Sequence, residues 1–330
     1  MKTLITADLH LNDNPRDAYR HKFMRWFLDL AKKHKVDRII VAGDLCDEKD
    51  RHPAVLVNQV VDYFYQLAEV CPVTVLKGNH DYLDPEHAFY GFLRRIENVS
   101  WINNPTVEDV GNKSHDLFLP HTTNYKHDWK GLNFKTPSYI FCHQTFNGAA
   151  VGFGRHLDGI PLDIFPKNAR VISGDIHVPQ QLGPVTYVGA PYTVDFGDDY
   201  QPRVLLIDGD KIKSIPVDGP QKRLIEAEAG NGCFEVNANL NKGDIIKFRI
   251  GVKNVDQWPE IKAEIKAWCE KHGFIAHAIQ PVLRRDETGM KSTKAKASNK
   301  SDEQILREYA LRRDLDKNLL STGLFLLDKV

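Results

Sequence analysis

The fold is decided by residues 38–47, which read RIIVAGDLCD. Residues 39–41 form a short run of β-branched side chains, and Gly43 and Asp44 follow soon after. A run of this kind, bounded by turn-forming residues, predicts a buried β-strand. In α/β sheets, the loops after the carboxyl ends of strands form the ligand sites. We therefore expect a strand that ends in a functional acidic side chain.

The same pattern occurs on both sides of this segment. Residues 4–7 form an apolar run before Asp8, and residues 72–76 form another before a Gly-Asn-His triplet. Between these runs, residues 16–34 and 54–69 carry apolar side chains at helical spacing. The alternation of strand, helix, strand, helix and strand predicts a layered α/β domain. Later strands are expected at residues 138–142, 169–173, 185–188 and 203–207.

Beyond residue 218 the sequence changes character. Residues 245–252 and 274–282 resemble strands, and residues 257–272 resemble a helix between them. This pattern predicts a small α+β cap domain that follows the main domain. We therefore expect the main domain at residues 1–218 and the cap, a candidate DNA-binding domain, at residues 219–283.

The last part of the chain differs from both domains. Residues 284–300 contain six Lys/Arg, two Asp/Glu and almost no large apolar residues, which predicts a basic flexible linker. Ser301 and Gln304 match a helix capping box. The helix that begins there has an apolar stripe with no nearby sequence to cover it, so residues 301–330 are expected to form a tethered, partner-binding helix.

Composition limits the class of protein. The chain has 44 Lys/Arg and 44 Asp/Glu, which argues against binding nucleic acid by bulk charge but leaves a local basic groove open. Five cysteines occur singly, as is typical of free thiols in a reducing compartment. No apolar run approaches the ~20 residues needed to span a membrane, and the N-terminus lacks a signal-peptide core. We expect a cytoplasmic protein without membrane contact.

Metal-binding types of side chain follow five of the predicted strands. They are Asp8 and His10, Asp44, Asn79 and His80, His143, and Asp175 and His177. Because the carboxyl ends of the strands share one rim, residues that are distant in sequence are expected to converge there. Carboxylate, imidazole and amide groups suit hard or borderline divalent ions such as Mn²⁺ or Mg²⁺. The lack of cysteine pairs argues against a structural zinc site.

A pair of such ions has a definite chemical use. Two metals ~3.5–4 Å apart activate a water molecule and hold a phosphate group for in-line attack. A carboxylate shared between the two ions keeps them close, and Asp44 lies in the middle of the set. The sequence therefore predicts a dinuclear centre that hydrolyses phosphate esters, with Asp44 as the candidate bridge.

The motifs carry a family resemblance. Asp8-x-His10, Gly43-Asp44, Gly78-Asn79-His80-Asp81, His143 and Gly174-x-x-His177 resemble, in order and spacing, the five motifs of the calcineurin-like metallophosphoesterases. Pro179-Gln180, the segment YVGAP at residues 187–191 and Asp195-Phe196-Gly197 are similar to SbcD-type exonuclease subunits.

The resemblance implies a fold and a function. It implies two sheets flanked by helices, Mn²⁺-dependent exonuclease and endonuclease activity on DNA, and a homodimer that works with an SbcC-type coiled-coil ATPase bound by the C-terminal helix. The size and compact cap are similar to phage-borne members, which would place a phage-encoded protein in the host cytoplasm.

The resemblance also implies a role for each site residue. Asp8, His10 and His177 would hold the first metal, and Asn79, His143 and Asp175 the second, with Asp44 bridging. His80 would protonate the leaving oxygen, and Asp47 would orient His80. Asp175 departs from the family pattern, because a histidine usually occupies this position. It would add a negative charge to the site.

Two other functions are consistent with the same sequence. One is a small-molecule or cyclic-nucleotide phosphoesterase, and the other is a non-catalytic scaffold with a degenerate metal site. Glu48 stands where protein phosphatases of the superfamily have arginine, which disfavours a phosphatase, and only Asp175 favours the scaffold. Arg51 and His52 are candidate DNA-phosphate contacts, although a solvated histidine at a helix start is an equal interpretation of His52.

Overall fold

The structure is a computed structural model that describes residues 1–111, 113–229, 240–252 and 257–283, together with positions 306, 321 and 324. The chain divides into two compact units, Met1–Leu283 and Arg284–Val330. Almost all of the second unit lies outside the described residues. The basic linker and the C-terminal helix expected at 284–300 and 301–330 therefore stay predictions, and the description that follows concerns the first unit.

Two six-stranded sheets form the main domain. The first sheet has the order β14-β13-β1-β2-β3-β4, with β14 (Lys211–Pro216), β13 (Arg203–Asp208), β1 (Lys2–Thr6), β2 (Arg38–Val41), β3 (Val73–Leu76) and β4 (Val99–Ile102). The second has the order β11-β12-β10-β7-β6-β5, with β11 (Gln180–Leu182), β12 (Val185–Tyr187), β10 (Val171–Gly174), β7 (Ile140–His143), β6 (Ser114–Leu119) and β5 (Thr106–Gly111).

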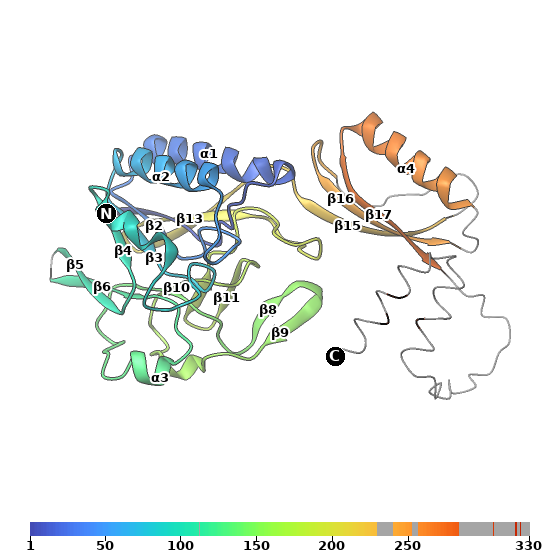
Figure 1. Cartoon of the computed structure of the whole chain (residues 1–330). Helices are drawn as coiled ribbons and strands as arrows, with labels where there is room; N and C mark the ends of the chain where they lie inside the picture. The colour runs from blue at the N-terminus through green and yellow to red at the C-terminus, as the bar shows by residue number, and fades with distance from the viewer. Residues whose placement is uncertain are drawn as a thin grey trace, which may run out of the picture. The chain divides into compact units, whose positions relative to one another are not determined.

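Helices cover the outer face of the first sheet. Figure 1 shows α1 (Ala18–His34) and α2 (Ala54–Ala68) side by side over this sheet. Their apolar sides pack on the outward residues of β1 to β3, in one cluster that includes Leu4, Phe27 and Phe64. The shorter elements are η1 (Pro15–Asp17), η2 (Phe89–Arg95), α3 (Tyr125–Asp128), β8 (Ala149–Val151), η3 (Gly152–Gly154), β9 (Arg155–Leu157) and η4 (Leu162–Ile164).

A second cluster fills the space between the two sheets. Ile5 and Ile40 of the first sheet meet Phe118, Phe141 and Ile172 of the second. The rings of Phe118 and Phe141 stack with their centroids 5.2 Å apart. Strands that are buried on both faces need continuous apolar runs, because neither face meets water. This requirement explains why the strand segments are apolar throughout instead of alternating. The predicted layered domain of two sheets flanked by helices is confirmed.

A third sheet forms the cap. It consists of β15 (Lys222–Glu228), β16 (Ile245–Val252) and β17 (Ile275–Leu283), all parallel, with α4 (Trp258–His272) packed on it. Its core includes Phe248, Ile265 and Cys269. Gly273 ends α4 in a left-handed conformation with φ of 74°, which suits glycine at a helix C-terminus. The predicted strand–helix–strand is present, and β15 is an additional edge strand.

The remaining predictions about the chain concern cysteines and membranes. Cys46, Cys71, Cys142 and Cys269 are buried and unpaired, as expected for free thiols. In the part of the chain that the structure describes, no helix has the length and apolar character needed to cross a bilayer.

Candidate metal centre

Five strands deliver the candidate ligands to one place. Strands β1, β2 and β3 are parallel neighbours in the first sheet, and β7 and β10 are parallel neighbours in the second. Each carries its metal-capable residues at or just after its carboxyl end. The loops that follow the two sets of strands meet at one rim of the sandwich, as the sequence predicts.

The backbone at this rim is held in an unusual conformation. Asp8, His10, Asp44 and Asp175 have positive φ values of 54°, 41°, 57° and 80°. Residues other than glycine adopt this left-handed region at an energetic cost, and such residues cluster at functional sites. The directions of these four candidate ligand side chains therefore depend on a backbone conformation that is energetically costly, which is typical of functional sites.

Two glycines allow the loops to approach closely. A Cβ atom on Gly43 would lie 2.2 Å from Nδ1 of His143, and one on Gly78 would lie 2.2 Å from Oδ1 of Asp44. Both contacts are far shorter than atoms tolerate. The glycines of the Gly-Asp and Gly-Asn-His motifs are therefore required because the ligand side chains occupy the space that a side chain would take.

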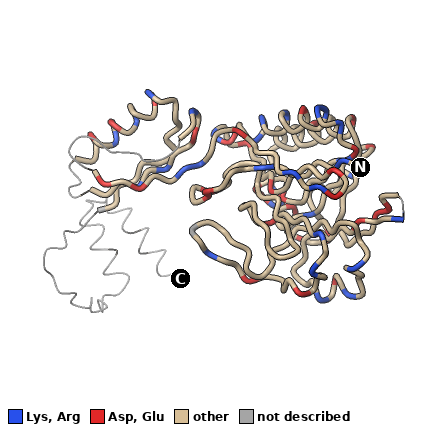
Figure 2. Tube along the Cα trace, turned by 180° about the vertical axis from the view of Figure 1, so that it is seen from behind, with Lys and Arg blue, Asp and Glu red and all other residues tan. Residues whose placement is uncertain are grey.

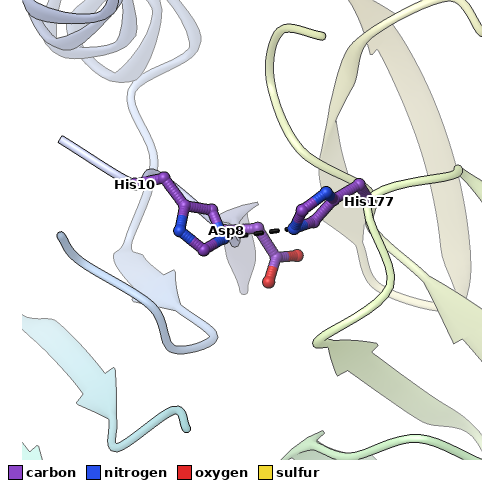
Figure 3. A group of neighbouring side chains, drawn as sticks. All are labelled: Asp8, His10 and His177. Atoms are coloured by element: carbon purple, nitrogen blue, oxygen red, sulfur yellow. Dashed lines mark hydrogen bonds between the residues drawn. The ribbon is translucent and has the colours of Figure 1, made fainter. Parts of the chain in front are cut away.

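Asp8, His10 and His177 form the first group of potential ligands. One ligand atom from each lies within 4.8 Å of the others. Figure 3 shows the two imidazoles approaching from opposite sides, with the Asp8 carboxylate between them. The Nε2 atoms of His10 and His177 are 3.1 Å apart. Oδ2 of Asp8 is buried without a hydrogen-bond partner, a costly state that a bound cation relieves.

His143, Asn79 and Asp44 form a second group. Nδ1–H of His143 donates to the carbonyl oxygen of Ala42 at 2.6 Å, which leaves its Nε2 as an acceptor. The side-chain amide of Asn79 is oriented so that its NH₂ group donates to that Nε2 at 2.9 Å and to the two Asp44 carboxylate oxygens at 3.1 and 3.3 Å. The group combines an imidazole nitrogen, a carboxylate and a side-chain amide, which are groups that suit a divalent cation.

Asp44 lies between the two groups. Its Oδ2 is 3.6 Å from Nε2 of His10, and its Oδ1 is 3.3 Å from Nε2 of His143. It also belongs to groups of potential ligands with His10 and with His143. This position is the one required of a carboxylate shared between two metals.

Asp175 lies beside the second group. Its Oδ1 is 3.8 Å from Nε2 of His143, and its Oδ2 accepts a hydrogen bond from the Thr145 hydroxyl. Its backbone N–H donates to Oδ1 of Asp8 at 2.9 Å. Asp175 is thus close enough to contribute an oxygen, although it is absent from the tightest groups of potential ligands found among the described residues.

His80 and Asp47 are arranged differently from the expectation. The Asp47 carboxylate does not hold His80. Its oxygens lie 3.2 Å from Nδ1 of His10 and 2.9 Å from the Arg20 guanidinium. His80 instead places Nδ1 2.6 Å from the backbone oxygen of Asp47, and its ring lies 4.8 Å from that of His10. Asp47 therefore positions His80 through its main chain and His10 through its carboxylate.

Two buried residues that sequence reasoning missed support the ligand loops. Arg20 is 2 % exposed, and its guanidinium donates to the carbonyl oxygen of His10. The Tyr192 hydroxyl donates to the carbonyl of Leu9, and the Tyr192 ring lies 5.4 Å from the guanidinium carbon. These two side chains therefore hold the backbone of the Asp-x-His loop by hydrogen bonds to its carbonyl oxygens. A charged residue inside the apolar stripe of a helix was the available signal for Arg20.

Asp81 ties two ligand loops together. Its carboxylate accepts hydrogen bonds from the backbone N–H groups of Asp44, Leu45 and Gly78 at 3.0, 2.9 and 2.7 Å. The sequence marked it only as the last letter of the Gly-Asn-His-Asp motif. Burial and the nearby Asp44 charge raise its pKa to about 6, against these hydrogen bonds.

The acids and imidazoles have different protonation preferences. Burial raises the pKa of the Asp8 carboxyl to about 7, against the attraction of His143. Burial also opposes ionisation of Asp44, yet the charges on His143 and His10 lower its pKa. Burial, with repulsion from His10, lowers the pKa of His177 to about 4. The His177 imidazole is therefore neutral at pH 7, which is the form that binds metals.

His52 does not fit the predicted DNA contact. Both of its ring nitrogens are buried without hydrogen-bond partners. The ring packs against Phe89 and Tyr90, with centroid distances of 4.4 and 5.1 Å, and burial lowers its pKa. His52 is a packing residue in this structure because the aromatic side chains of η2 enclose it. Arg51 is exposed and stays a candidate contact.

Comparisons with known proteins agree with this arrangement. Residues 1–206 match the family model described as calcineurin-like phosphoesterase. The chain is 39% identical to the SbcD subunit of the nuclease SbcCD of Escherichia coli strain K12, over 82% of this chain and 77% of that protein. It is 24% identical to exonuclease subunit 1 of Enterobacteria phage T4, over 62% of this chain and 63% of that protein. The chain therefore belongs to the calcineurin-like phosphoesterase family, in the branch that includes the SbcD subunit of the SbcCD nuclease.

Proposed function

We propose that this protein is a DNA nuclease that hydrolyses phosphodiester bonds with two divalent metal ions. The observation that carries the proposal is the convergence of carboxylate, imidazole and amide groups from five strand ends around Asp44. The similarity over most of the chain to a nuclease subunit, SbcD of Escherichia coli, supports DNA as the substrate.

The two groups of ligands assign the metals. Asp8, His10 and His177 would hold the first ion, Asn79, His143 and Asp175 would hold the second, and Asp44 would be shared between the two groups. When bound, the ions lower the pKa of a water molecule and neutralise charge on the phosphate. The oxygen-rich second set favours Mn²⁺, with Mg²⁺ as the alternative, over zinc.

His80 handles the proton of the leaving group. Its Nδ1 is engaged by the Asp47 carbonyl, so Nε2 is the atom left for the substrate. A protonated Nε2 donates to the 3′ oxygen as the bond to phosphorus breaks, which is general acid catalysis. The Asp47 backbone fixes the ring, and the Asp44 carboxylate accepts from the His80 backbone N–H at 2.8 Å. Asp44 therefore links the position of His80 to the metal centre.

The similarity to the SbcD subunit also supports a proposal about the partners and the location of this protein. We propose that the chain works as a homodimer with an SbcC-type ATPase, in the cytoplasm, and that residues 301–330 dock the ATPase. Arg51 is a proposed contact for DNA phosphate. The cap at residues 219–283, with β15 to β17 and α4, is a proposed DNA-binding domain.

A digestion assay tests the proposal. The full chain, loaded with Mn²⁺, should degrade linear duplex DNA, and it should also hydrolyse a phosphodiester dye. EDTA should stop both reactions. Hydrolysis of the dye without cleavage of DNA, with or without an ATPase partner, would favour a small-molecule phosphoesterase. A protein that binds no metal and cleaves neither substrate would be a scaffold.

A further inference from the structure

A cavity of about 330 Å³ is lined in part by His121, whose ring packs against that of His143 in the second group of ligands. Its walls come from the residues that flank the Gly-Asn-His-Asp motif, from the loop after β4, and from the loop after β6 that leads into α3. Figure 1 shows β4, β6 and α3 on the same side of the main domain. The cavity is in the range of volumes that hold small ligands.

A buried lysine lies in the wall of this cavity. Lys77 is 4 % exposed. Its ammonium group donates to the carbonyl oxygen of Pro85 at 2.9 Å and lies 4.9 Å from the centre of the Tyr82 ring. In the described part of the chain, no carboxylate forms an ion pair with it. Lysine is almost never this buried without a paired anion. The ammonium group of Lys77 is therefore available to pair with an anionic group of a ligand.

The acidic residues of the cavity wall do not supply that anion. Asp128 accepts a hydrogen bond from the Thr122 hydroxyl and lies 2.9 Å from Nδ1 of His127. Glu86 is exposed, so water screens its charge. Neither carboxylate pairs with Lys77. The Lys77 ammonium group is therefore attracted by these carboxylates only at long range, without a direct ion pair.

His121 connects the cavity to the metal centre. Its backbone N–H donates to the carbonyl oxygen of Lys77 at 2.8 Å, and its Nδ1 lies 2.8 Å from the Tyr82 hydroxyl. The ring packs edge-on to that of His143 at a centroid distance of 6.2 Å. A group bound at Lys77 would therefore be separated from the second metal site by one imidazole.

We propose that this cavity is a subsite for a second phosphate of the nucleic-acid substrate, with the Lys77 ammonium as its anchor and His121 and Tyr82 beside it. The inference rests on the proposed nuclease function. Phosphates recur along a DNA strand, so a strand with one phosphate at the metals presents others nearby. An internal phosphodiester and a terminal phosphate share this chemistry. Lys77 thus extends substrate binding beyond the reacting group.

Substrate analogues test the subsite on the unaltered protein. A set of oligonucleotide duplexes would each carry one neutral methylphosphonate near the cleavage site, and two further duplexes would differ only in a terminal phosphate. Losing one charge-assisted contact should raise KM ~10-fold or more at one defined position. Sensitivity only to the terminal phosphate would identify a strand end as the occupant, and sensitivity at an internal position would identify the continuing strand.

Variants test the assignment to Lys77. Lys77→Met removes the charge with little change in length, Lys77→Arg retains it, and Lys33→Met is a control at an exposed lysine of α1. Lys77→Met should raise KM for DNA ~10-fold and should no longer respond to the sensitive methylphosphonate. It should also reduce the slope of log KM against log salt by about 0.7–0.9, the effect of one phosphate contact. Lys77→Arg should restore much of the slope, and Lys33→Met should behave like the unaltered protein.

The possible results separate the subsite from the function. If the unaltered protein cleaves DNA but no methylphosphonate or terminal phosphate matters, the subsite is wrong and the nuclease assignment stands. If Lys77→Met keeps the normal salt slope and the normal sensitivity, Lys77 is a structural tether for Pro85. If Lys77→Met does not fold, the methylphosphonate series still decides whether the phosphate contact exists. If the unaltered protein does not cleave DNA with any metal, the function itself is wrong, and the subsite falls with it.

Discussion

Each proposed catalytic side chain is held by contacts that can be tested one at a time. His80 has one ring nitrogen on the Asp47 carbonyl and belongs to a group with His10 and Asp44. Metals and proton transfer therefore compete for the same imidazole. The proposed role requires that His80 donate a proton and that it bind no metal.

A substitution separates these two roles. His80→Ala should lower the rate of DNA cleavage by ~10²–10⁴-fold, the range for a general acid, while two metal ions per chain are retained. His87→Ala, at an exposed histidine, is the matched control and should cleave normally. Metal content and single-turnover rates are the measurements. A normal rate in His80→Ala would rule out the proton-transfer role, and loss of one metal would make His80 a ligand.

Asp175 would add a negative charge to the second group of ligands. Its side chain accepts from Thr145 and approaches His143. Asp175→Asn should weaken binding of the second ion by at least about tenfold, because even a change in a residue that only hydrogen-bonds to a metal ligand lowers metal affinity by about 10–100-fold. Asp175→His keeps a ligand and should be milder. Extra negative charge raises the pKa of metal-bound water, so Asp175→His should move the activity optimum to lower pH.

The measurement is calorimetric titration with Mn²⁺ and Zn²⁺, together with nuclease rates over pH. Asp163→Asn, at an exposed aspartate of η4, is the control. The unaltered protein should prefer Mn²⁺ or Mg²⁺ over Zn²⁺. If Asp175→Asn binds two ions with unchanged affinity, Asp175 is a turn residue and other groups build the second site.

The position of the site was predictable because metal-binding side chains come directly after the predicted strands. Asp8, His10 and Asp44 follow their strands and meet in the structure. The supporting contacts were beyond the sequence because they depend on which loops become neighbours. The Asp47 carboxylate lies on His10, and Arg20 reaches the same loop from α1. Each contact joins two segments that become neighbours only in the folded protein. A pattern within either segment does not reveal which other segment it will contact.

At the scale of elements, the loops after β2 and β3 act as one unit. Asp81 accepts three backbone hydrogen bonds within this unit. Asp44 and Asn79 leave from the two loops that it joins. Hydrogen bonds that fix these loops also fix the positions of the ligand side chains that they carry.

The contribution of the Asp81 hydrogen bonds to stability and to metal binding can be measured. Asp81→Asn replaces one acceptor oxygen by an NH₂ group that faces backbone donors, so it should lower the free energy of unfolding by about 1–3 kcal/mol. It should also weaken Mn²⁺ binding, because Asp44 and Asn79 lose their common anchor. Denaturant unfolding and calorimetry are the measurements, and Asp62→Asn, exposed on α2, is the control. Unchanged stability and unchanged Mn²⁺ affinity would show that the loops hold their shape without Asp81.

The long helices and most inner strands were predictable, whereas the inner strand β6 and every edge strand except β17 were not predicted. α2 spans Ala54–Ala68 against the expected 54–69, and β3 spans Val73–Leu76 against 72–76. β5 alternates half-buried and exposed side chains, and β15 carries charges in the sequence KRLIEAE. Edge strands meet water and are protected by polar residues, so their sequences lack the apolar run that marks a central strand.

At the scale of the whole molecule, charge is balanced and not concentrated. Figure 2 shows basic and acidic positions interspersed along the trace, in line with the formal net charge of zero. Non-specific attraction to DNA therefore contributes little. Under the proposed function, DNA would be held by the metals, by local contacts such as the one proposed for Lys77, and by partner proteins, for which the C-terminal segment is the proposed docking element.

Deletion of residues 301–330 tests that segment. These residues belong to a compact unit separate from Met1–Leu283. The shortened protein should hydrolyse a phosphodiester dye at the normal rate, since every proposed ligand lies in the first unit. It should fail to co-purify with its ATPase partner. Retained association would contradict the docking role, and an insoluble product would favour packing of the segment on its own domain.

The central claim is that this metal centre cleaves DNA. The most direct measurement is digestion of linear duplex DNA in Mn²⁺ by the unaltered chain and by Asp44→Asn, prepared in parallel with metal content determined. Asp44 lies 3.6 and 3.3 Å from the two ligand histidines, and removal of its charge keeps the shape of the side chain. The unaltered chain should cleave, EDTA should abolish cleavage, and Asp44→Asn should lose metal and at least ~10³-fold in rate. Cleavage that survives EDTA, or an Asp44→Asn variant as active as the unaltered chain, would contradict the account.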